Sequence, residues 1–509
     1  MPDKSLRAPS LRRVRAAVRP ASQALALACL LAGCAVGPDY KTPPTPLGGG
    51  YAHDALATST HAAPVSGGAA QNFVSGLDIP GQWWTLYHSE ALNALIDQAL
   101  QHSPTLDAAQ AALREANANV TAERGSFFPT ISGNLSPERE KINGALEGLP
   151  YNPIYNLYGA TVNVSYTVDA FGGTRRQLEQ IQAQADYQRY ALAASYLSLT
   201  SNIVTAAINA ASLRAQIAAT EDIVRAERAQ LDIVQRQVSA GAASRSDVLQ
   251  QQSTLASTEA TLPALRSQLV QQRNQLATYV GVLPADFQDP EFKLDELVLP
   301  DTLPISLPSQ LVAQRPDIQE YAAQLHQATA NVGIATANML PQITLSGSFG
   351  GQSLSVSNLF SPASAVWSLA GSLTQPLFEG GTLKAKRSAA IAAAQEAEAN
   401  YRGTVLTAFQ DVSNVLYALQ ADADALQSNL TAEQSAAESL SIIETRFRTG
   451  ADTYVQVLTA QQTYQNAVIA LVKARAQRYA DTAALFQALG GGWWNQAASN
   501  STTVDSGRG

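Results

Sequence analysis

The stretch that decides the fold is Tyr158-Gly-Ala-Thr-Val-Asn-Val-Ser-Tyr-Thr-Val-Asp169, in which apolar residues alternate with small or polar ones. Successive side chains of a β-strand point to opposite faces, so this stretch would present one apolar and one polar face. Such alternation over about ten residues is typical of a membrane-spanning strand, with its apolar side chains against lipid. A soluble hairpin with one buried face is the alternative, and the lack of further strands to pack against disfavours it.

Three other stretches carry the same alternation. One long example covers 367–377, and shorter ones begin at Ile131 and Ile343. An open sheet edge in hydrocarbon leaves backbone groups without partners, and known barrels begin at about eight strands. Four strands per chain therefore predict an oligomer. The residues predicted to face lipid are Tyr158, Val162, Val164, Tyr166, Trp367 and Leu369.

Polar segments containing proline and glycine are expected to form loops between the strands of each pair, at 136–157 and 350–364. The first of them contains Glu138 and Glu140, two acids close enough in sequence to suggest paired carboxylates. We expect these acids to be solvated loop residues rather than catalytic groups.

The chain contains an internal repeat, which organises all of these segments. His102-Ser103-Pro104 returns as Gln314-Arg315-Pro316, and Ala240-Gly241-Ala242 returns as Thr449-Gly450-Ala451. Each half is therefore expected to contain a helix, a strand, a loop, a second strand, a very long helix, a tight turn and a further helix.

The very long helices are predicted because residues 174–240 contain neither glycine nor proline and 382–449 contain only Gly403. Apolar residues recur at alternating spacings of three and four in both, which is the seam of a coiled coil. Gly241 and Gly450 are candidate helix C-caps. Shorter helices are expected to return from about 244 to 280 and from 452 to 489.

The N-terminus has the pattern of an export signal, with six Lys/Arg before a short apolar run at 21–31. It ends in Leu31-Ala32-Gly33-Cys34, which resembles the bacterial lipobox, so Cys34 is the predicted lipidation site. Ala35 stands where an aspartate commonly retains lipoproteins at the inner membrane, so the outer membrane is the expected destination. An ordinary secretory signal is the alternative.

Composition excludes several functions. Cleavage after Gly33 would remove six Lys/Arg and one Asp, taking the formal net charge from -8 to -13 and disfavouring a nucleic-acid partner. No other run of about 18 apolar residues is present, so no transmembrane helix is expected. No phosphate-binding loop, nucleophile elbow or paired-histidine metal motif occurs. We expect no enzyme activity, no cofactor and no metal site.

Several motifs together resemble the TolC-type outer-membrane factors of tripartite efflux systems, and among them the NodT-like lipoprotein subgroup. Residues 34–40 are similar to the mature N-terminus of that subgroup, Trp83-Trp84 to its first-helix signature, Arg315-Pro316-Asp317 to the opening of its second half, and 488–493 to its C-terminal ending. The resemblance runs from Cys34 to about Asn495.

This resemblance implies a mainly α protein with a transmembrane β-barrel. Three chains would contribute four strands each to a 12-stranded barrel, continued by a long α-helical barrel in the periplasm. The implied function is a passive exit duct for small toxic compounds in a multidrug efflux pump of the RND type, as in antibiotic resistance. Its implied partners are a periplasmic adaptor, an inner-membrane pump and outer-membrane lipid. Alternatives are the duct of a type I protein-secretion or metal-efflux system, or a lipid-anchored structural coiled coil.

The same resemblance places a gate at the periplasmic tip, around Gly241 and Gly450. Many members carry aspartates there within Val-Asp-Val-Leu-Asp-Ala, whereas this chain has Val455-Gln456-Val457-Leu458-Thr459-Ala460. Gln456 and Thr459 thus replace both acids. The remaining candidate ring acids are Asp247, with Arg245 as a possible partner, and Asp452. Capping of its own helix is the alternative role for Asp247.

The expected domains follow from the repeat. They are a signal peptide (1–33), a lipidated extended segment (34–88), the first repeat (89–282), an equatorial connector (283–309), the second repeat (310–490) and a tail (491–509).

Overall fold

The computed structural model describes residues 35–44, 50–51, 57–143, 146, 148 and 150–495. The signal segment 1–33, the predicted lipidation site Cys34 and the end of the tail lie outside the described residues. The chain divides into two compact units, and each unit takes segments from both repeats. The first contains 114–186 and 322–400 with the stretch before Pro43, and the second contains the other segments.

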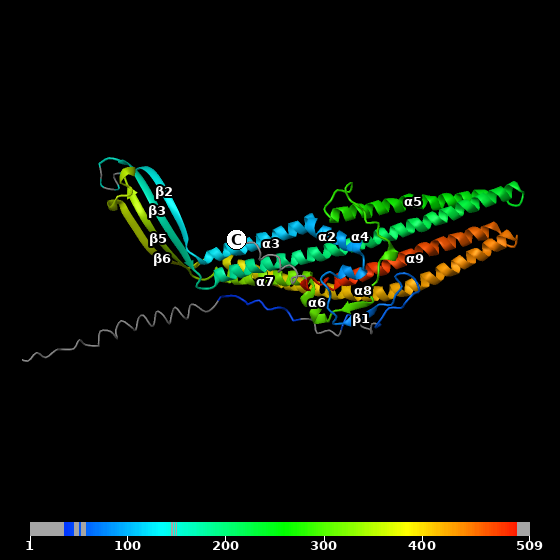
Figure 1. The fold of residues 1–509 in the computed structure, drawn as a ribbon. Coiled ribbons are helices and arrows are strands. Elements are labelled where there is room, and N and C mark those ends of the chain that lie inside the picture. The colour runs from blue at the N-terminus through cyan, green and yellow to red at the C-terminus, as the bar shows by residue number, and fades with distance from the viewer. Residues whose placement is uncertain are drawn as a thin grey trace, which may run out of the picture. The chain divides into compact units, whose positions relative to one another are not determined.

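Long helices and a few strands alternate along the chain (Figure 1). The helices are α2 (Glu90–His102), α3 (Pro104–Arg124), α4 (Gly173–Ser239), α5 (Arg245–Tyr279), α6 (Pro308–Gln314), α7 (Pro316–Ala337), α8 (Thr382–Arg448) and α9 (Tyr454–Ala488). The strands are β1 (Asn72–Ser75), β2 (Thr130–Lys141), β3 (Ile154–Val168), β4 (Thr302–Ile305), β5 (Gln342–Ser353) and β6 (Ala365–Thr374). Short 3-10 turns are η1 (Trp83–Tyr87), η2 (Gly125–Phe127), η4 (Leu294–Glu296), η5 (Val356–Asn358), η6 (Pro362–Ser364) and η7 (Trp493–Asn495).

The two repeats have matching elements, which confirms the internal repeat. Helices α4 and α8 each have 67 residues, and α5 and α9 each have 35. Both repeats open with a helix pair that is interrupted before a proline, at Ser103 and at Arg315, whose backbones are extended. A proline disfavours helical conformation in the residue before it, and this explains both breaks.

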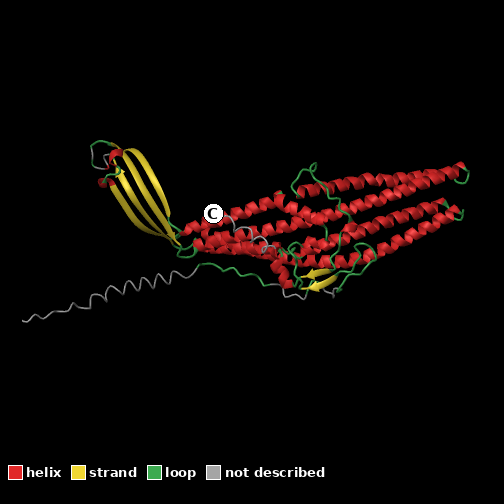
Figure 2. Cartoon of the chain, viewed as in Figure 1, coloured by secondary structure: helices red, strands yellow, loops and turns green. Residues whose placement is uncertain are grey.

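The first unit contains a four-stranded antiparallel sheet in the order β2-β3-β5-β6, drawn in yellow in Figure 2. Strands β2 and β6 form its edges. At one end, β2 follows α3 and η2, and β3 leads within a few residues into α4. At the other end, β3 is joined to β2 and β6 to β5 by loops.

The strands extend further than the sequence indicated, so the expected loop at 136–157 is wrong in extent. Strand β2 continues to Lys141 and β5 to Ser353, each with 12 residues, and β3 already begins at Ile154. Glu138 and Glu140 are therefore strand residues. Pro137 lies within β2, which is an edge strand. Proline has no backbone N–H, and it is tolerated here because the outer side of an edge strand has no neighbouring strand that needs a donor. Strand β6 ends at Thr374, short of the expected Leu377.

In the second unit the coiled-coil seam of α8 is buried over most of its length, whereas that of α4 is buried in its central part and half-buried on either side. Of the apolar residues with this spacing on α8, Phe409 is half-buried and the others are buried: Val405, Val412, Leu416, Leu419, Ala423, Leu426 and Leu430. On α4, Leu199, Ile203, Ala206 and Ala210 are buried. Helix α4 also contains an 18-residue window with a mean hydropathy of 1.4, of which 56% is buried within the structure. By length and composition α4 could cross a membrane, but more than half of this window is buried against the rest of the chain, as in the core helix of a soluble protein, so it does not contradict the expectation of no transmembrane helix.

An aromatic cluster anchors the second unit around η1. Trp83 stacks on Phe486 with ring centroids 5.2 Å apart, and the hydroxyl of Tyr87 donates to the carbonyl of Tyr479 at 2.8 Å. All four side chains are buried. Nearby in sequence, β1 pairs in parallel with β4 from the connector between the repeats.

Candidate functional site

One face of the four-stranded sheet is apolar across all four strands. Residues directly opposite each other in antiparallel strands point to the same face. The register aligns Val162 with Phe349, and Phe349 with Trp367. It also aligns Val164 with Ile131 on β2 and, through Gly347, with Leu369 on β6.

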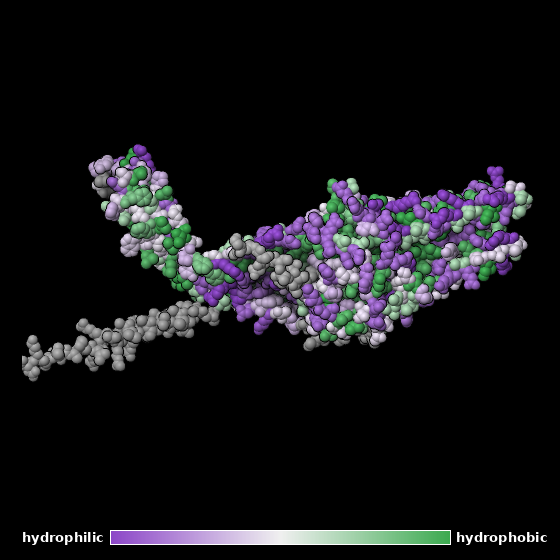
Figure 3. All heavy atoms as spheres, in the orientation of Figure 1, coloured by the Kyte–Doolittle hydropathy of each residue, from purple (hydrophilic) through white to green (hydrophobic). Residues whose placement is uncertain are grey.

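All six residues predicted to face lipid lie on this apolar face: Tyr158, Val162, Val164, Tyr166, Trp367 and Leu369. Trp367 is 76% exposed and Leu369 81% exposed, which leaves large apolar side chains without a covering element in the single chain. Apolar atoms on the strands are visible in green in Figure 3. Tyr158 and Tyr166 are eight residues apart on β3, about 26 Å along the strand, which at the usual strand tilt of about 40° is about 20 Å of height, most of an apolar band about 25 Å tall.

The opposite face carries small polar side chains. Asn163 of β3 lies opposite Ser348 of β5, and Ser348 lies opposite Ser368 of β6. The hydroxyl groups of Ser348 and Ser368 are 2.8 Å apart and hydrogen-bonded. This face can be hydrated without loss of backbone pairing, because the hydrogen bonds of the strands run within the sheet.

The tip of each helix hairpin in the second unit is a tight turn with glycine in the left-handed region. Gly241 has φ +76° and Gly450 has φ +77°. In the first turn Ala242 N–H donates to the carbonyl of Gln237 at 2.8 Å, and in the second Ala451 N–H donates to Arg446 at 2.9 Å. This pairing is the Schellman motif, so both glycines are the C-caps that the sequence predicted.

Asp247 caps the N-terminus of α5. Its carboxylate accepts a hydrogen bond from the backbone N–H of Ser244 at 2.9 Å, and the Ser244 hydroxyl accepts one from Asp247 N–H at 3.3 Å. Gln456 takes the matching position on α9, where its side-chain oxygen accepts from the Thr453 N–H at 2.7 Å. Both residues thus close capping boxes, and the capping alternative describes Asp247 in the single chain.

The other tip candidates have separate surroundings. The side chain of Asp452 is only 8% exposed, and its carboxylate pairs with the guanidinium of Arg446 at 3.0 Å. Thr459 donates to the carbonyl of Val455 within α9 at 2.9 Å. Arg245 is exposed, and none of the described carboxylates pairs with it. The structure therefore does not bring Arg245, Asp247 and Asp452 into one cluster within a chain.

A buried polar network behind the tip was missed by sequence reasoning. Tyr454 of α9 donates its hydroxyl proton to the side chain of Gln251 on α5. Gln251 in turn donates to the backbone carbonyl of Glu227 on α4 at 3.1 Å, and Thr258 donates to the Glu227 carboxylate at 3.1 Å. Burial raises the pKa of Glu227. The sequence did not reveal this network, because the spacing of these polar residues does not indicate that they contact one another across three helices.

A second missed arrangement holds residues 35–40 against the start of α4 in the first unit. Arg176 is buried, and it pairs with Asp39 at 2.6 Å and with Glu179 at 2.7 Å. His326 of α7 lies 2.9 Å from Glu179 and stacks on Tyr40 with ring centroids 4.3 Å apart. The segment that follows Cys34 is therefore attached beside the junction of β3 and α4.

Arg315, in the motif that opens the second repeat, connects three helices. Its guanidinium donates to Asp317 at 2.7 Å, to Asp411 of α8 at 3.1 Å and to the backbone carbonyl of Ala488 on α9 at 3.1 Å. Such a fork of hydrogen bonds suits arginine rather than lysine. The motif thus has a structural role at this position.

Comparison with known families and proteins gives consistent matches. The model of the family described as outer membrane efflux protein matches residues 95–282 and 307–491. The toluene efflux pump outer membrane protein TtgC of Pseudomonas putida is 28% identical over 472 residues, covering 92% of this chain and 95% of that protein. The pyoverdine export outer membrane protein OpmQ of Pseudomonas aeruginosa is 31% identical over 426 residues, covering 81% of this chain and 87% of OpmQ.

Solved structures agree with these matches. The outer-membrane channel OprN superimposes with a TM-score of 0.82 at 26% identity, covering 90% of this chain and all of OprN.

Proposed function

Because this chain belongs to the outer membrane efflux protein family, we propose that three copies form the exit duct of a tripartite efflux pump. The observation that carries this proposal is the four-stranded sheet, which has one apolar face, one polar face and two open edges. In hydrocarbon both edges need partners. Pairing of β2 in one copy with β6 in the next satisfies them, and three copies give twelve strands.

In this assembly the apolar face contacts lipid and the polar face lines a water-filled bore. The residues toward lipid are Tyr158, Val162, Val164, Tyr166, Trp367 and Leu369. The long helices continue the duct into the periplasm. Cys34, once acylated, anchors each chain in the inner leaflet, since every buried CH₂ contributes about 0.8 kcal/mol.

The duct is passive, so the energy for transport comes from an inner-membrane pump. A periplasmic adaptor that binds the tips of the helix hairpins couples the pump to the duct. The names of the relatives mention toluene and pyoverdine, which are both small molecules. We therefore assign small toxic or secreted compounds as the transported class, in preference to proteins.

Photo-crosslinking at the tips in living cells tests this function. A crosslinker placed at exposed Arg245 or Val455 is expected to capture an adaptor and a pump, which mass spectrometry identifies. A strain that lacks the gene is expected to become more susceptible to several small toxic compounds. Expression of the protein from a plasmid is expected to restore resistance. Capture of a protein-export transporter, with unchanged susceptibility, would instead indicate a secretion duct.

A further inference from the structure

The last residues of β2 separate opposite charges onto opposite faces of the sheet. Arg139 and Lys141 share the side of Leu135 and Ile131, because side chains two residues apart lie on one face. Glu138 and Glu140 take the other face. Tyr155, which lies opposite Glu140 in the register, donates its hydroxyl proton to that carboxylate at 2.6 Å. Both cations therefore lie on the apolar face, and both acids on the polar one.

The two cations have no protein counter-ion among the described residues. Both side chains are exposed, and neither Arg139 nor Lys141 forms an ion pair with a described carboxylate. They also lie at the end of the sheet that is away from the helices. In the assembly proposed above, this end is at the cell surface and its apolar face is turned to the outer leaflet. The cations are thus placed at the level of lipid headgroups.

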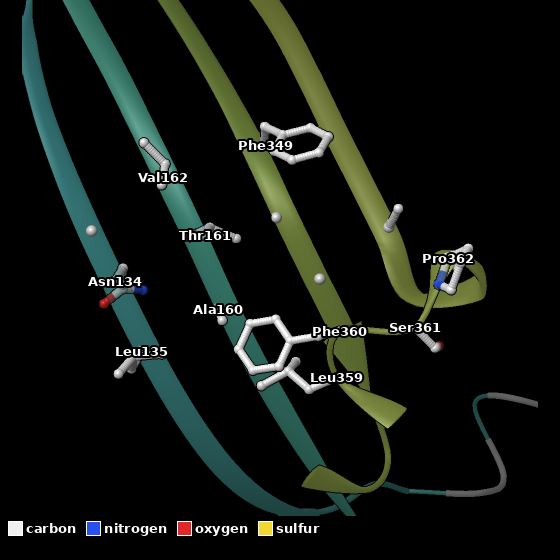
Figure 4. Close-up of a pocket in the computed structure, with 14 residues that line it drawn as sticks. Asn134, Leu135, Ala160, Thr161, Val162, Phe349, Leu359, Phe360, Ser361 and Pro362 are labelled. Atoms are coloured by element: carbon white, nitrogen blue, oxygen red, sulfur yellow. The ribbon is translucent and has the colours of Figure 1, made fainter. Parts of the chain in front are cut away.

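An apolar pocket lies on the same face, nearer the middle of the sheet (Figure 4). The loop between β5 and β6 folds back over the strands, and the carbonyl of Leu359 would be 2.1 Å from a Cβ at Gly351. Leu135, Val162 and Phe349 form the floor, while Leu359, Phe360 and Pro362 form a wall. Leu359 is buried, whereas the ring of Phe360 is 84% exposed. Gly351 allows this close approach because it has no side chain.

The spacing between cations and pocket matches a lipid. Arg139 is four residues from Leu135 on β2, which is about 13 Å along the strand. An acyl chain that enters the pocket would therefore have its headgroup beside Arg139 and Lys141. Arginine and lysine both bind phosphate oxygens, arginine in a bidentate manner.

We propose that this face binds the phosphorylated, multiply acylated glycolipid of the outer leaflet, lipopolysaccharide, with a phosphate at Arg139 and Lys141 and an acyl chain in the pocket. The proposal rests on the outward orientation of the apolar face in the proposed duct. Lipopolysaccharide is preferred to a glycerophospholipid because the outer leaflet carries it. Its several phosphates and chains can also occupy both cations and the pocket at once.

Retention of lipid by the full-length trimer tests the proposal. Trimer purified from outer membranes is reconstituted in nanodiscs containing either lipid A or phosphatidylglycerol, and bound lipid is quantified by native mass spectrometry. The double variant Arg139→Glu with Lys141→Glu is expected to retain lipid A at least tenfold less, since hydrogen bonds between charged groups are replaced by repulsion. Phe360→Asp, at an exposed loop position, is expected to lower retention several-fold with both cations intact.

The matched control is Glu138→Gln with Glu140→Gln, which changes charge on the same strand but on the opposite face. It is expected to retain lipid A as the natural chain does. Equal retention in all variants, or equal binding of phosphatidylglycerol and lipid A, would overturn the proposal. Heat stability of each trimer and drug susceptibility of its host are recorded in parallel. If a variant loses bound lipid A while its host remains drug-resistant, the lipid site and the duct function are shown to be separate properties.

Discussion

At Asp422 the surroundings hold a carboxyl group in its protonated form. Burial between α8 and α9 raises its pKa to about 8, and hydrogen bonding and repulsion from Asp481 act in the same direction, while Arg478 opposes them. Arg478 is itself buried, with its guanidinium donating to the backbone carbonyls of Gly67 and Ala69. The charge of the arginine is therefore shared among several acceptors and does not fully stabilise an Asp422 anion.

This carboxyl predicts a pH-dependent stability. The unfolded Asp422 loses its proton near pH 4, whereas the folded group keeps it until about pH 8. Between these values the folded state binds more protons, so stability is present at low pH and is lost as the pH rises. Trimers should resist heat better at pH 5 than at pH 8, as dissociation on gels would measure.

Asp422→Asn should flatten this dependence, because the amide is neutral throughout. Glu438→Gln, at an exposed position on the same helix, is the control and should leave the slope unchanged. An unaltered slope in Asp422→Asn would assign the dependence to other groups.

The lipid anchor is also decided by one residue. We predict that Cys34→Ser yields a protein that is still exported but carries no fatty acid, because the cysteine follows a signal sequence at a lipobox-like site. Residues 35–40 should keep their place, since Arg176 and His326 bind them independently of any acyl chain. Metabolic labelling checks this prediction, and fatty acid found on the serine variant would move the anchor elsewhere.

At the scale of the strand, neighbouring positions on β3 should respond differently to the same charge. Val162 lies on the apolar face and Thr161 on the polar face. In the proposed duct, Val162→Arg places a cation in hydrocarbon at a cost of about 2 to 4 kcal/mol per chain near the midplane, whereas Thr161→Arg meets water. Val162→Arg should therefore weaken the trimer, and Thr161→Arg should be tolerated much better. Equal heat resistance of both trimers would contradict the facing.

At the scale of the whole assembly, the tips from several copies meet around one axis in the proposed duct. Gln456 and Thr459 are neutral at the positions where the family resemblance implies acids, so we predict that multivalent cations added from the periplasmic side block this channel weakly. Gln456→Asp with Thr459→Asp should strengthen the block. Aspartate at the third helical position can also retain the capping box that Gln456 now forms.

Planar-bilayer recordings measure this block, with Asp247→Asn as the matched variant. In the single chain the Asp247 carboxylate accepts a hydrogen bond from the backbone N–H of Ser244. Asp247→Asn should therefore change the cation block of the channel only slightly, through a weaker helix cap. Strong block of the natural channel that persists in Asp247→Asn would place the cation site elsewhere than at this residue.

The sequence alone determined the elements that local chemistry controls. Alternation predicted β3 and the facing of its side chains, and the absence of helix breakers predicted the 67-residue helices α4 and α8. Gly241 and Gly450 were identified as caps because a left-handed turn strongly favours glycine. These features depend on neighbours in the chain, so they are visible before folding. The charge alternation at 138–141 was equally visible, but its meaning required the knowledge that β2 extends that far.

Only the tertiary structure decided which distant residues meet. The edge position of β2 allows Pro137 within a strand. Residues 136–141, which were expected to lie in a loop, therefore form the charged end of β2. Folding also brought Asp39 to Arg176, Tyr454 to Gln251, and Asp481 to Asp422. None of these pairs follows from sequence spacing, because polar contacts between elements depend on how the helices rotate against each other. That rotation is set by the packing of the apolar seams as a whole, which positions the polar groups that face one another.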